Sequence, residues 1–332
     1  MKSLKSLLLL GVAVGLFIAA AVAEELPLIR IGDGGGLCEG PIHIGIEKGF
    51  FTAEGLRVET FKLAPGTAFE AIAAGKIDAT NGLLATLLAP LVHGLPIKIT
   101  TGLHTGCNKV LVPANSPIKT AADFRGKKVG VPSLVSSPIT FAKRVLAASG
   151  VGVSATNMEV EFIVYSEAEL PLALERGAID AIAGGDPIAA IAAKKNNLTV
   201  LFDSATLPPY NEQYCCAAYV SNALYEKSPE VAAKFTRAMQ QASLWIQSHQ
   251  DETAAIQVEK KYVPGDAELN AAVLKTYNFI PSAQGAYTAF AALTQELRAI
   301  GVIAEDFDVE HLKSTSFAFD LPGGVLDPIT ER

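Results

Sequence analysis

A nine-residue pattern that occurs twice is the feature that most constrains the fold of this chain. Residues 71–79 and 173–181 both read A-x-x-x-G-x-I-D-A, and the copies are about one hundred residues apart. The glycine suits the left-handed residue that ends a helix, and the Ile-Asp-Ala that follows suits a turn into a strand. Two helix-opening prolines, Pro41 and Pro138, recur at nearly the same offset. The repeat therefore predicts two similar α/β lobes.

Strands and helices are predicted to alternate through the first 200 residues. Strands are expected at 28–32, 56–63, 77–80, 97–101, 128–131, 160–164 and 179–183, and helices at 41–51, 67–74, 83–92, 138–149 and 167–175. This alternation indicates βαβ units and a mainly parallel sheet in each lobe.

The pattern changes after residue 200. A strand is expected at 217–221, then a long helix at 228–248 that opens with Ser-Pro-Glu, and further helices at 251–262, 266–276 and 283–300. We expect this part to pack on the first lobe. Lobe 1 would then comprise residues 24–110 and 220–332, and lobe 2 residues 111–219.

The first 23 residues have the three parts of a secretory signal peptide. Lys2 and Lys5 precede an uncharged apolar stretch, and Ala21-Val22-Ala23 suits the cleavage site. The apolar stretch is shorter than the roughly 20 residues that a spanning helix needs. We therefore expect cleavage after residue 23 and a freely soluble protein of the periplasm.

The charge of the chain argues against two classes of partner. The net charge is −7, and the predicted signal peptide contains two lysines and no acidic residue. An acidic chain without a basic run is not expected to bind nucleic acid or anionic membranes, although a cleft can still attract an anion locally. Nothing in the sequence requires an oligomer, so a monomer is expected.

Common catalytic motifs are missing from the sequence. The run Gly34–Gly36 does not continue as G-x-G-x-x-G, and there is no P-loop, G-x-S-x-G or H-E-x-x-H. A nucleophile pair of Cys107 and His104 would lack an orienting third group. We expect neither catalytic residues nor a cofactor.

Several stretches together resemble one family of transport proteins. They are residues 41–51 (PIHIGIEKGFF), 71–79, 116–132, 177–187 and 228–235. In order and spacing they resemble the nitrate/sulfonate/taurine and thiamine-pyrimidine-precursor group of solute-binding proteins of ABC transporters. The resemblance implies a type II periplasmic-binding-protein fold, a cleft between the lobes, and capture of a solute by lobe closure. It also implies delivery to an inner-membrane permease with a cytoplasmic ATPase.

The ligand implied by the resemblance is a small anionic or zwitterionic organic molecule. A sulfonate, a nitrate-like anion and a thiamine-type precursor all remain open, and a metal or metal complex is the alternative. Fungal thiamine-pyrimidine synthases resemble this fold and have a longer run of consecutive cysteines. Because only Cys215 and Cys216 are consecutive here, that enzymatic activity is the less favoured interpretation.

The candidate ligand-binding residues lie in loops after the predicted strands, since ligands of open α/β sheets bind beyond the carboxyl ends of the strands. They are Gly36, Cys38, Glu39, Asn81, His104, Cys107, Ser136, Ser137, Thr140, Asp186 and Cys215. The hydroxyls at Ser136, Ser137 and Thr140 suit an oxyanion at a helix start, with ordinary N-capping as the alternative. Asp186 matches a cleft position of the family, where an acid would favour a ligand with a cationic or N–H donor group.

The four cysteines have three open interpretations. Cys38 and Cys107 would form a disulfide in an oxidising compartment, with Cys215 and Cys216 free or bridged to each other. Alternatively, Cys38, His104 and Cys107 would hold a soft metal ion, although no C-x-x-C spacing supports it. Finally, the thiols would be plain buried side chains.

Overall fold

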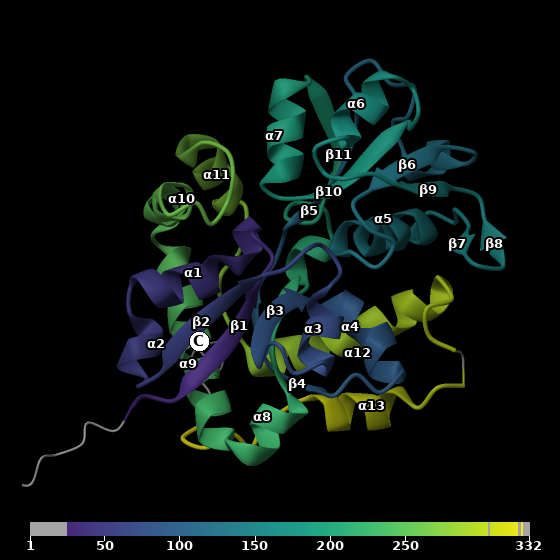
Figure 1. The fold of residues 1–332 in the computed structure, drawn as a ribbon. Coiled ribbons are helices and arrows are strands. Elements are labelled where there is room, and N and C mark those ends of the chain that lie inside the picture. Colours follow the sequence, from purple (N-terminus) through teal and green to yellow (C-terminus); the bar gives the residue numbers. More distant parts are fainter. Residues whose placement is uncertain (1–24, 305, 325–326, 328–332) are drawn as a thin grey trace, which may run out of the picture.

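The computed structural model describes residues 25–304, 306–324 and 327, and it contains two α/β lobes (Figure 1). Each lobe is built on a five-stranded sheet, with strand orders β2-β1-β3-β12-β4 and β11-β5-β10-β6-β9. The predicted two-lobed α/β architecture is confirmed. The predicted signal peptide lies outside the described residues. Among the helices of the described part, none combines the length and the apolar character needed to cross a membrane.

The first lobe combines the N-terminal segment with the last third of the chain. Its strands are β1 (Leu28–Asp33), β2 (Arg57–Lys62), β3 (Ala79–Leu83), β4 (Ile97–His104) and β12 (Cys216–Ser221). Its helices are η1 (Leu37–Glu39), α1 (Gly40–Glu47), α2 (Phe50–Ala53), α3 (Ala68–Ala73), α4 (Leu84–Val92), α8 (Asn222–Lys227), α9 (Pro229–Gln247), α10 (Gln250–Glu259), α11 (Ala267–Leu274), α12 (Ala283–Ala299) and α13 (Val309–Ser316). The apolar side of α9 packs on α1, α2 and β4.

The second lobe is a continuous segment. Its sheet contains β5 (Asn108–Pro113), β6 (Lys128–Val131), β9 (Glu161–Val164), β10 (Ala181–Gly185) and β11 (Leu198–Asp203). The other elements are η2 (Ala121–Phe124), α5 (Ser137–Ala148), the short hairpin β7 (Val153–Ser154) and β8 (Asn157–Met158), α6 (Leu170–Glu175), α7 (Ile188–Lys195) and η3 (Tyr210–Glu212). α5 and α7 begin at the edge of this sheet that faces the first lobe (Figure 1).

The repeated pattern occupies equivalent places in the two lobes. Gly75 and Gly177 end α3 and α6 with φ values of 66° and 69°, as a left-handed helix end requires. The following Asp78 carboxylate accepts from the Arg30 N–H at 2.9 Å in β1, and Asp180 accepts from the Lys128 N–H at 2.8 Å in β6. In both lobes the aspartate therefore ties the next strand to its parallel neighbour.

The chain passes between the lobes twice. The first crossover joins the end of β4 at His104 to the start of β5 at Asn108, and the second joins Asp203 in β11 to Cys216 in β12. The lobe boundaries expected at residues 110 and 219 fall inside β5 and β12.

Some predicted elements differ in the structure. The helix predicted at 41–51 is divided into α1 and α2, because Gly49 adopts a φ of 75°. The strand predicted at 77–80 begins later, at Ala79, since Ile77 and Asp78 still belong to the turn. The elements that were not predicted include α7, α8, α13 and β11.

Candidate functional site

A cavity of about 200 Å³ lies between the lobes, at the carboxyl ends of the parallel strands. The first lobe contributes the segments that follow β1 and β2, the end of β3 with the start of α4, and a residue of β12, namely Gly34–Gly36, Cys38, Glu39, Leu63–Gly66, Ala68, Phe69, Thr80–Leu83, Thr86 and Tyr219. The second lobe contributes the loops after β6, β9 and β10, namely Pro132, Val135–Pro138, Glu167 and Gly185–Ile188. Both lobes thus form the cavity, as expected for ligands of open α/β sheets.

Two buried oxygen atoms in the cavity wall lack a hydrogen-bond donor. They are Asn81 Oδ1 and Asp186 Oδ1, and neither has a partner in the described part of the chain. The opposite ends of both side chains are held, since Asn81 Nδ2 donates to the Cys38 carbonyl at 3.1 Å and Asp186 Oδ2 accepts from Lys109 Nζ at 2.6 Å. Because unpaired buried acceptors are costly, these two atoms suit a ligand that brings N–H or O–H donors.

The charged side chains that line the cavity are acidic. They are Glu39, Glu167 and Asp186, and the described lining residues include no Lys, Arg or His. Burial, assisted by the charge of Asp33, raises the pKa of Glu39 to about 7, although Cys38 and the Gly36 N–H donate to its carboxylate. Asp186 is also buried, and burial raises its pKa although Lys109 and Tyr277 oppose the shift.

Two helices begin in the wall of the cavity. α5 begins at Ser136–Ser137 and α7 at Pro187–Ile188, both in the cavity wall. The Ser136 hydroxyl does not cap α5 but donates to the Ser133 carbonyl at 2.8 Å. The N–H groups of a helix start carry partial positive charge, so this side of the cavity suits an anionic or acceptor group.

Asp33 fixes the glycine loop of the cavity. Its buried carboxylate accepts from the Gly35 N–H at 2.8 Å, from Lys62 Nζ at 2.6 Å and from His43 Nε2 at 3.1 Å. Gln257 Nε2 donates to Nδ1 of the same imidazole, which leaves the Nε2 proton for Asp33. Burial alone would raise the pKa of Asp33, but His43, Lys62 and Gly35 together lower it to about 2.

Seven of the predicted binding residues line the cavity, and the rest do not. Gly36, Cys38, Glu39, Asn81, Ser136, Ser137 and Asp186 are in its wall. Thr140 instead faces a neighbouring groove and donates to the Ser136 carbonyl. His104, Cys107 and Cys215 are buried behind the wall. The His104 ring is stacked on Tyr277, and its nitrogens are 3.1 and 3.3 Å from the carbonyls of Thr105 and Cys38.

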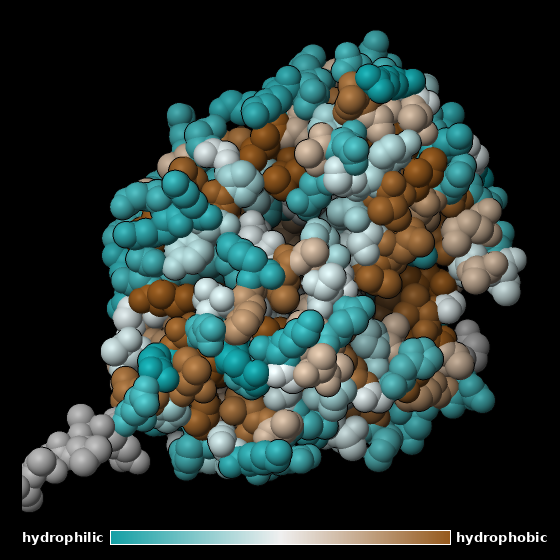
Figure 2. Space-filling view, in the orientation of Figure 1, coloured by the Kyte–Doolittle hydropathy of each residue, from teal (hydrophilic) through white to brown (hydrophobic). Residues whose placement is uncertain are grey.

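The neighbouring groove is apolar. It has a volume of about 400 Å³ and is lined mainly by Leu134, Val135, Ile139, Leu297, Ile300 and Val302. Figure 2 shows apolar side chains gathered between α5 and α12 on this face. Gly66, Phe69, Thr86 and Val135 line both the groove and the cavity, so the two are adjacent.

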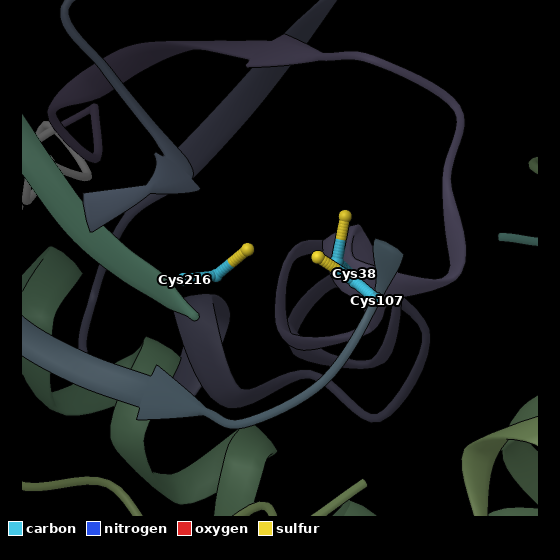
Figure 3. A group of neighbouring side chains, drawn as sticks. All are labelled: Cys38, Cys107 and Cys216. Atoms are coloured by element: carbon cyan, nitrogen blue, oxygen red, sulfur yellow. The ribbon is translucent and has the colours of Figure 1, made fainter. Parts of the chain in front are cut away.

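The four cysteines are free thiols in the structure, so the disulfide between Cys38 and Cys107, one of the three interpretations left open, is not formed. Cys38, Cys107 and Cys216 have their sulfur atoms within 4.8 Å of one another (Figure 3), and Cys107 Sγ is also 2.6 Å from Cys215 Sγ. The three neighbouring thiols of Cys215, Cys216 and Cys38 hold the pKa of Cys107 well below the usual thiol value. His104, which the alternative metal interpretation grouped with Cys38 and Cys107, contacts the carbonyls of Thr105 and Cys38 instead, and Cys216 is the third member of the group.

Comparison with known proteins assigns the family. The family model described as NMT1/THI5 like matches residues 40–253. The chain belongs to the NMT1/THI5-like family. It is 28% identical over 231 residues to a protein of Haemophilus influenzae named for thiamine biosynthesis, covering 68% of this chain and 69% of the relative. It is 27% identical over 238 residues to a Bacillus subtilis protein named as binding aliphatic sulfonates, covering 70% and 69%.

A solved structure shares the fold. The periplasmic nitrate-binding protein of Synechocystis superposes with a TM-score of 0.72 at 16% identity, covering 90% of this chain and 87% of that one. The predicted periplasmic-binding-protein fold is confirmed, and the NMT1/THI5-like family agrees with the resemblance found in the sequence.

Proposed function

We propose that this protein is an ABC-importer solute receptor that captures a small zwitterionic or amine-bearing organic molecule in the cavity between its lobes. The observation that carries the proposal is the pair of unpartnered acceptors, Asn81 Oδ1 and Asp186 Oδ1, in a wall formed by both lobes. A ligand with N–H donors would pair these oxygens. The relative named for sulfonate binding and the nitrate-binding neighbour support the receptor class.

A zwitterion fits the charges better than a bare inorganic anion. The helix starts at Ser137 and Ile188 favour an anionic end, whereas Glu39, Glu167 and Asp186 favour a cationic or N–H donor end. No basic side chain among the described lining residues would neutralise nitrate or sulfate. An aminosulfonate satisfies this pattern, and an aminopyrimidine such as a thiamine precursor satisfies it with ring-nitrogen acceptors in place of the anionic end.

The proposed receptor acts in the periplasm and passes its solute to an inner-membrane permease with a cytoplasmic ATPase. It binds its solute without converting it. The relative named for thiamine biosynthesis makes an enzyme the alternative, which product analysis after incubation with each solute would reveal.

The test is calorimetric titration with a matched pair of solutes. We expect 2-aminoethanesulfonate to bind more tightly than ethanesulfonate, which lacks the ammonium group, and nitrate to bind weakly. An aminopyrimidine with a hydroxymethyl group completes the panel. Equal binding of the two sulfonates would contradict the role given to the acceptors, and binding of none of the four compounds would contradict the ligand class.

A variant pair then places the solute in the cavity. Asn81→Ala removes an acceptor from the cavity wall and is expected to weaken binding roughly tenfold, the effect of one lost hydrogen bond. Asn222 Oδ1 is also buried and lacks a partner in the described part of the chain, but Asn222 directly follows the last residue of β12 and does not line the cavity. Asn222→Ala should therefore leave the affinity unchanged, and an equal loss in both variants would place the solute elsewhere.

A further inference from the structure

Three cysteines from separate segments meet next to the cavity. Cys38 comes from η1, Cys107 from the first crossover and Cys216 from the start of β12. Their sulfur atoms all lie within 4.8 Å of one another, and Figure 3 shows the thiols of Cys107 and Cys216 pointing toward each other with the Cys38 thiol next to Cys107. We propose that Cys38, Cys107 and Cys216 form a binding site for a soft divalent metal ion such as Zn²⁺ or Cd²⁺. This site goes beyond the proposed capture of an organic solute and does not depend on it.

The spacing of the sulfur atoms is close to that of a metal–thiolate site. Sulfur ligands at about 2.3 Å from Zn²⁺ are about 3.8 Å apart in a tetrahedral arrangement. The three thiols therefore need to approach one another by about 1 Å or less, within the reach of small rotations at χ1. Thiolates select Zn²⁺ and similar soft ions over Mg²⁺ and Ca²⁺, which prefer oxygen ligands. Each thiol that binds the ion releases its proton to solvent.

The backbone already holds the three residues in place. The Cys38 carbonyl accepts from Asn81 Nδ2 at 3.1 Å, and Cys216 pairs in the sheet with both Leu83 and His104. Cys107 has a φ of 136°, a conformation that residues other than glycine seldom adopt and that is concentrated at functional sites. A strained backbone and fixed neighbours give the site its geometry before any ion arrives.

A second layer of contacts supports the sulfur atoms. Asn108 Nδ2 donates to Cys107 Sγ at 3.1 Å, the kind of hydrogen bond that orients a metal ligand. Cys38 Sγ is 3.2 Å from Glu39 Oε2, so a carboxylate oxygen contacts one of the three sulfur atoms. The Cys107 and Cys216 side chains are buried, whereas Cys38 is half-buried and lines the cavity. An ion would therefore enter from the cavity side, past Cys38.

The test uses the purified protein, reduced and stripped of metal with a chelator, and titrated with Cd²⁺. Ultraviolet absorption from sulfur-to-cadmium charge transfer reports thiolate ligation, and elemental analysis reports the number of ions per chain. We expect one tightly bound ion with the charge-transfer band. Cys216→Ser and Cys38→Ser should each weaken binding by more than about 100-fold, beyond the range typical of outer-shell changes.

Cys215→Ser is the matched control. Cys215 precedes Cys216 in the chain, is also buried and is 2.6 Å from Cys107, but it lies outside the group of three. It should keep one tightly bound ion. Cys38 is half-buried, so Cys38→Ser is expected to fold normally, and circular dichroism checks this for each variant. The proposal is overturned if the wild type shows no charge-transfer band, if Cys38→Ser and Cys216→Ser keep the ion, or if Cys215→Ser loses as much affinity as Cys216→Ser.

Discussion

At the scale of single residues, Asp33 links the stability of the fold to the shape of the cavity. Its carboxylate is almost fully buried, and its pKa is lowered to about 2 from an ordinary value of 3.8. Because the pKa of Asp33 is lower in the folded state than in the unfolded state, the ionised carboxylate adds to the free energy of unfolding. This contribution is complete above about pH 4 and is lost as the pH falls through about 2. The size of the shift corresponds to about 2 kcal/mol.

We therefore expect Asp33→Asn to lower the free energy of unfolding by about 2 kcal/mol at pH 7 and to flatten its pH dependence between pH 4 and pH 2. Urea unfolding of wild type and variant across this range measures both effects. Identical slopes for the two proteins below pH 4 would show that Asp33 does not carry this part of the acid sensitivity.

The cysteine group shows how far single residues can be predicted from sequence. The candidate residues included Cys215 and omitted Cys216, yet Cys216 is the one that joins Cys38 and Cys107. Both thiols of the pair reach Cys107, since Cys215 Sγ is 2.6 Å from Cys107 Sγ, but only Cys216 belongs to the group in which all three sulfur atoms are close together. The choice depends on the pairing of Cys216 with Leu83 and His104, which no local pattern reveals. That Cys38 and Cys107 lie close together could be predicted, because both residues follow strands of the first lobe.

At the scale of elements, two loops from different lobes meet at the edge of the cavity. Gly66, between β2 and α3, has a φ of 82°, and a Cβ atom there would be 2.9 Å from Val135 Cγ2 and 3.0 Å from Ser133 Oγ in the loop before α5. These contacts cross from one lobe to the other. A side chain at Gly66 would therefore obstruct the approach of the lobes that is seen in this structure.

Gly66→Ala is expected to weaken solute binding, and Gly75→Ala is its control. Gly75 has a φ of 66°, but a Cβ atom there would have no neighbour within 4 Å, so this position has the backbone strain without the contact between lobes. Both variants should lose about 1 kcal/mol of stability in urea unfolding. Only Gly66→Ala should also lose affinity in calorimetry. A similar affinity loss in both variants would mean that strain, and not the contact with the second lobe, is responsible.

The elements themselves were largely predictable, because the repeat and the alternation of strands and helices are local signals. The equivalent placing of Asp78 and Asp180 is the clearest example. The break between α1 and α2 was missed because Gly49 lies within an otherwise helical stretch, and only its left-handed conformation ends the helix.

The cavity wall could be predicted from strand ends, whereas Lys109 and Tyr277, which hold Asp186, come from distant segments that meet only in the folded chain.

At the scale of the whole molecule, the lobes are in contact across the cavity. The Leu37 N–H donates to the Asp186 carbonyl at 3.1 Å, and the Tyr277 hydroxyl donates to Asp186 Oδ2 at 2.9 Å. Leu37 and Tyr277 belong to the first lobe and Asp186 to the second. These bonds join the two lobes next to the cavity, and a solute in the proposed site would touch both lobes at once. A solute that binds the closed form better than the open form shifts the population toward closure.

Small-angle X-ray scattering should detect this closure. We expect the radius of gyration to fall when the solute that binds most tightly in calorimetry is added to saturation, because the two lobes are joined by only two crossovers and can move as bodies. Gly66→Ala should show a smaller decrease at saturating solute, since its side chain obstructs the closed form, whereas Gly75→Ala should behave like the wild type. An unchanged radius of gyration in the wild type, with binding verified on the same sample, would show that the solute enters a cavity that is already closed.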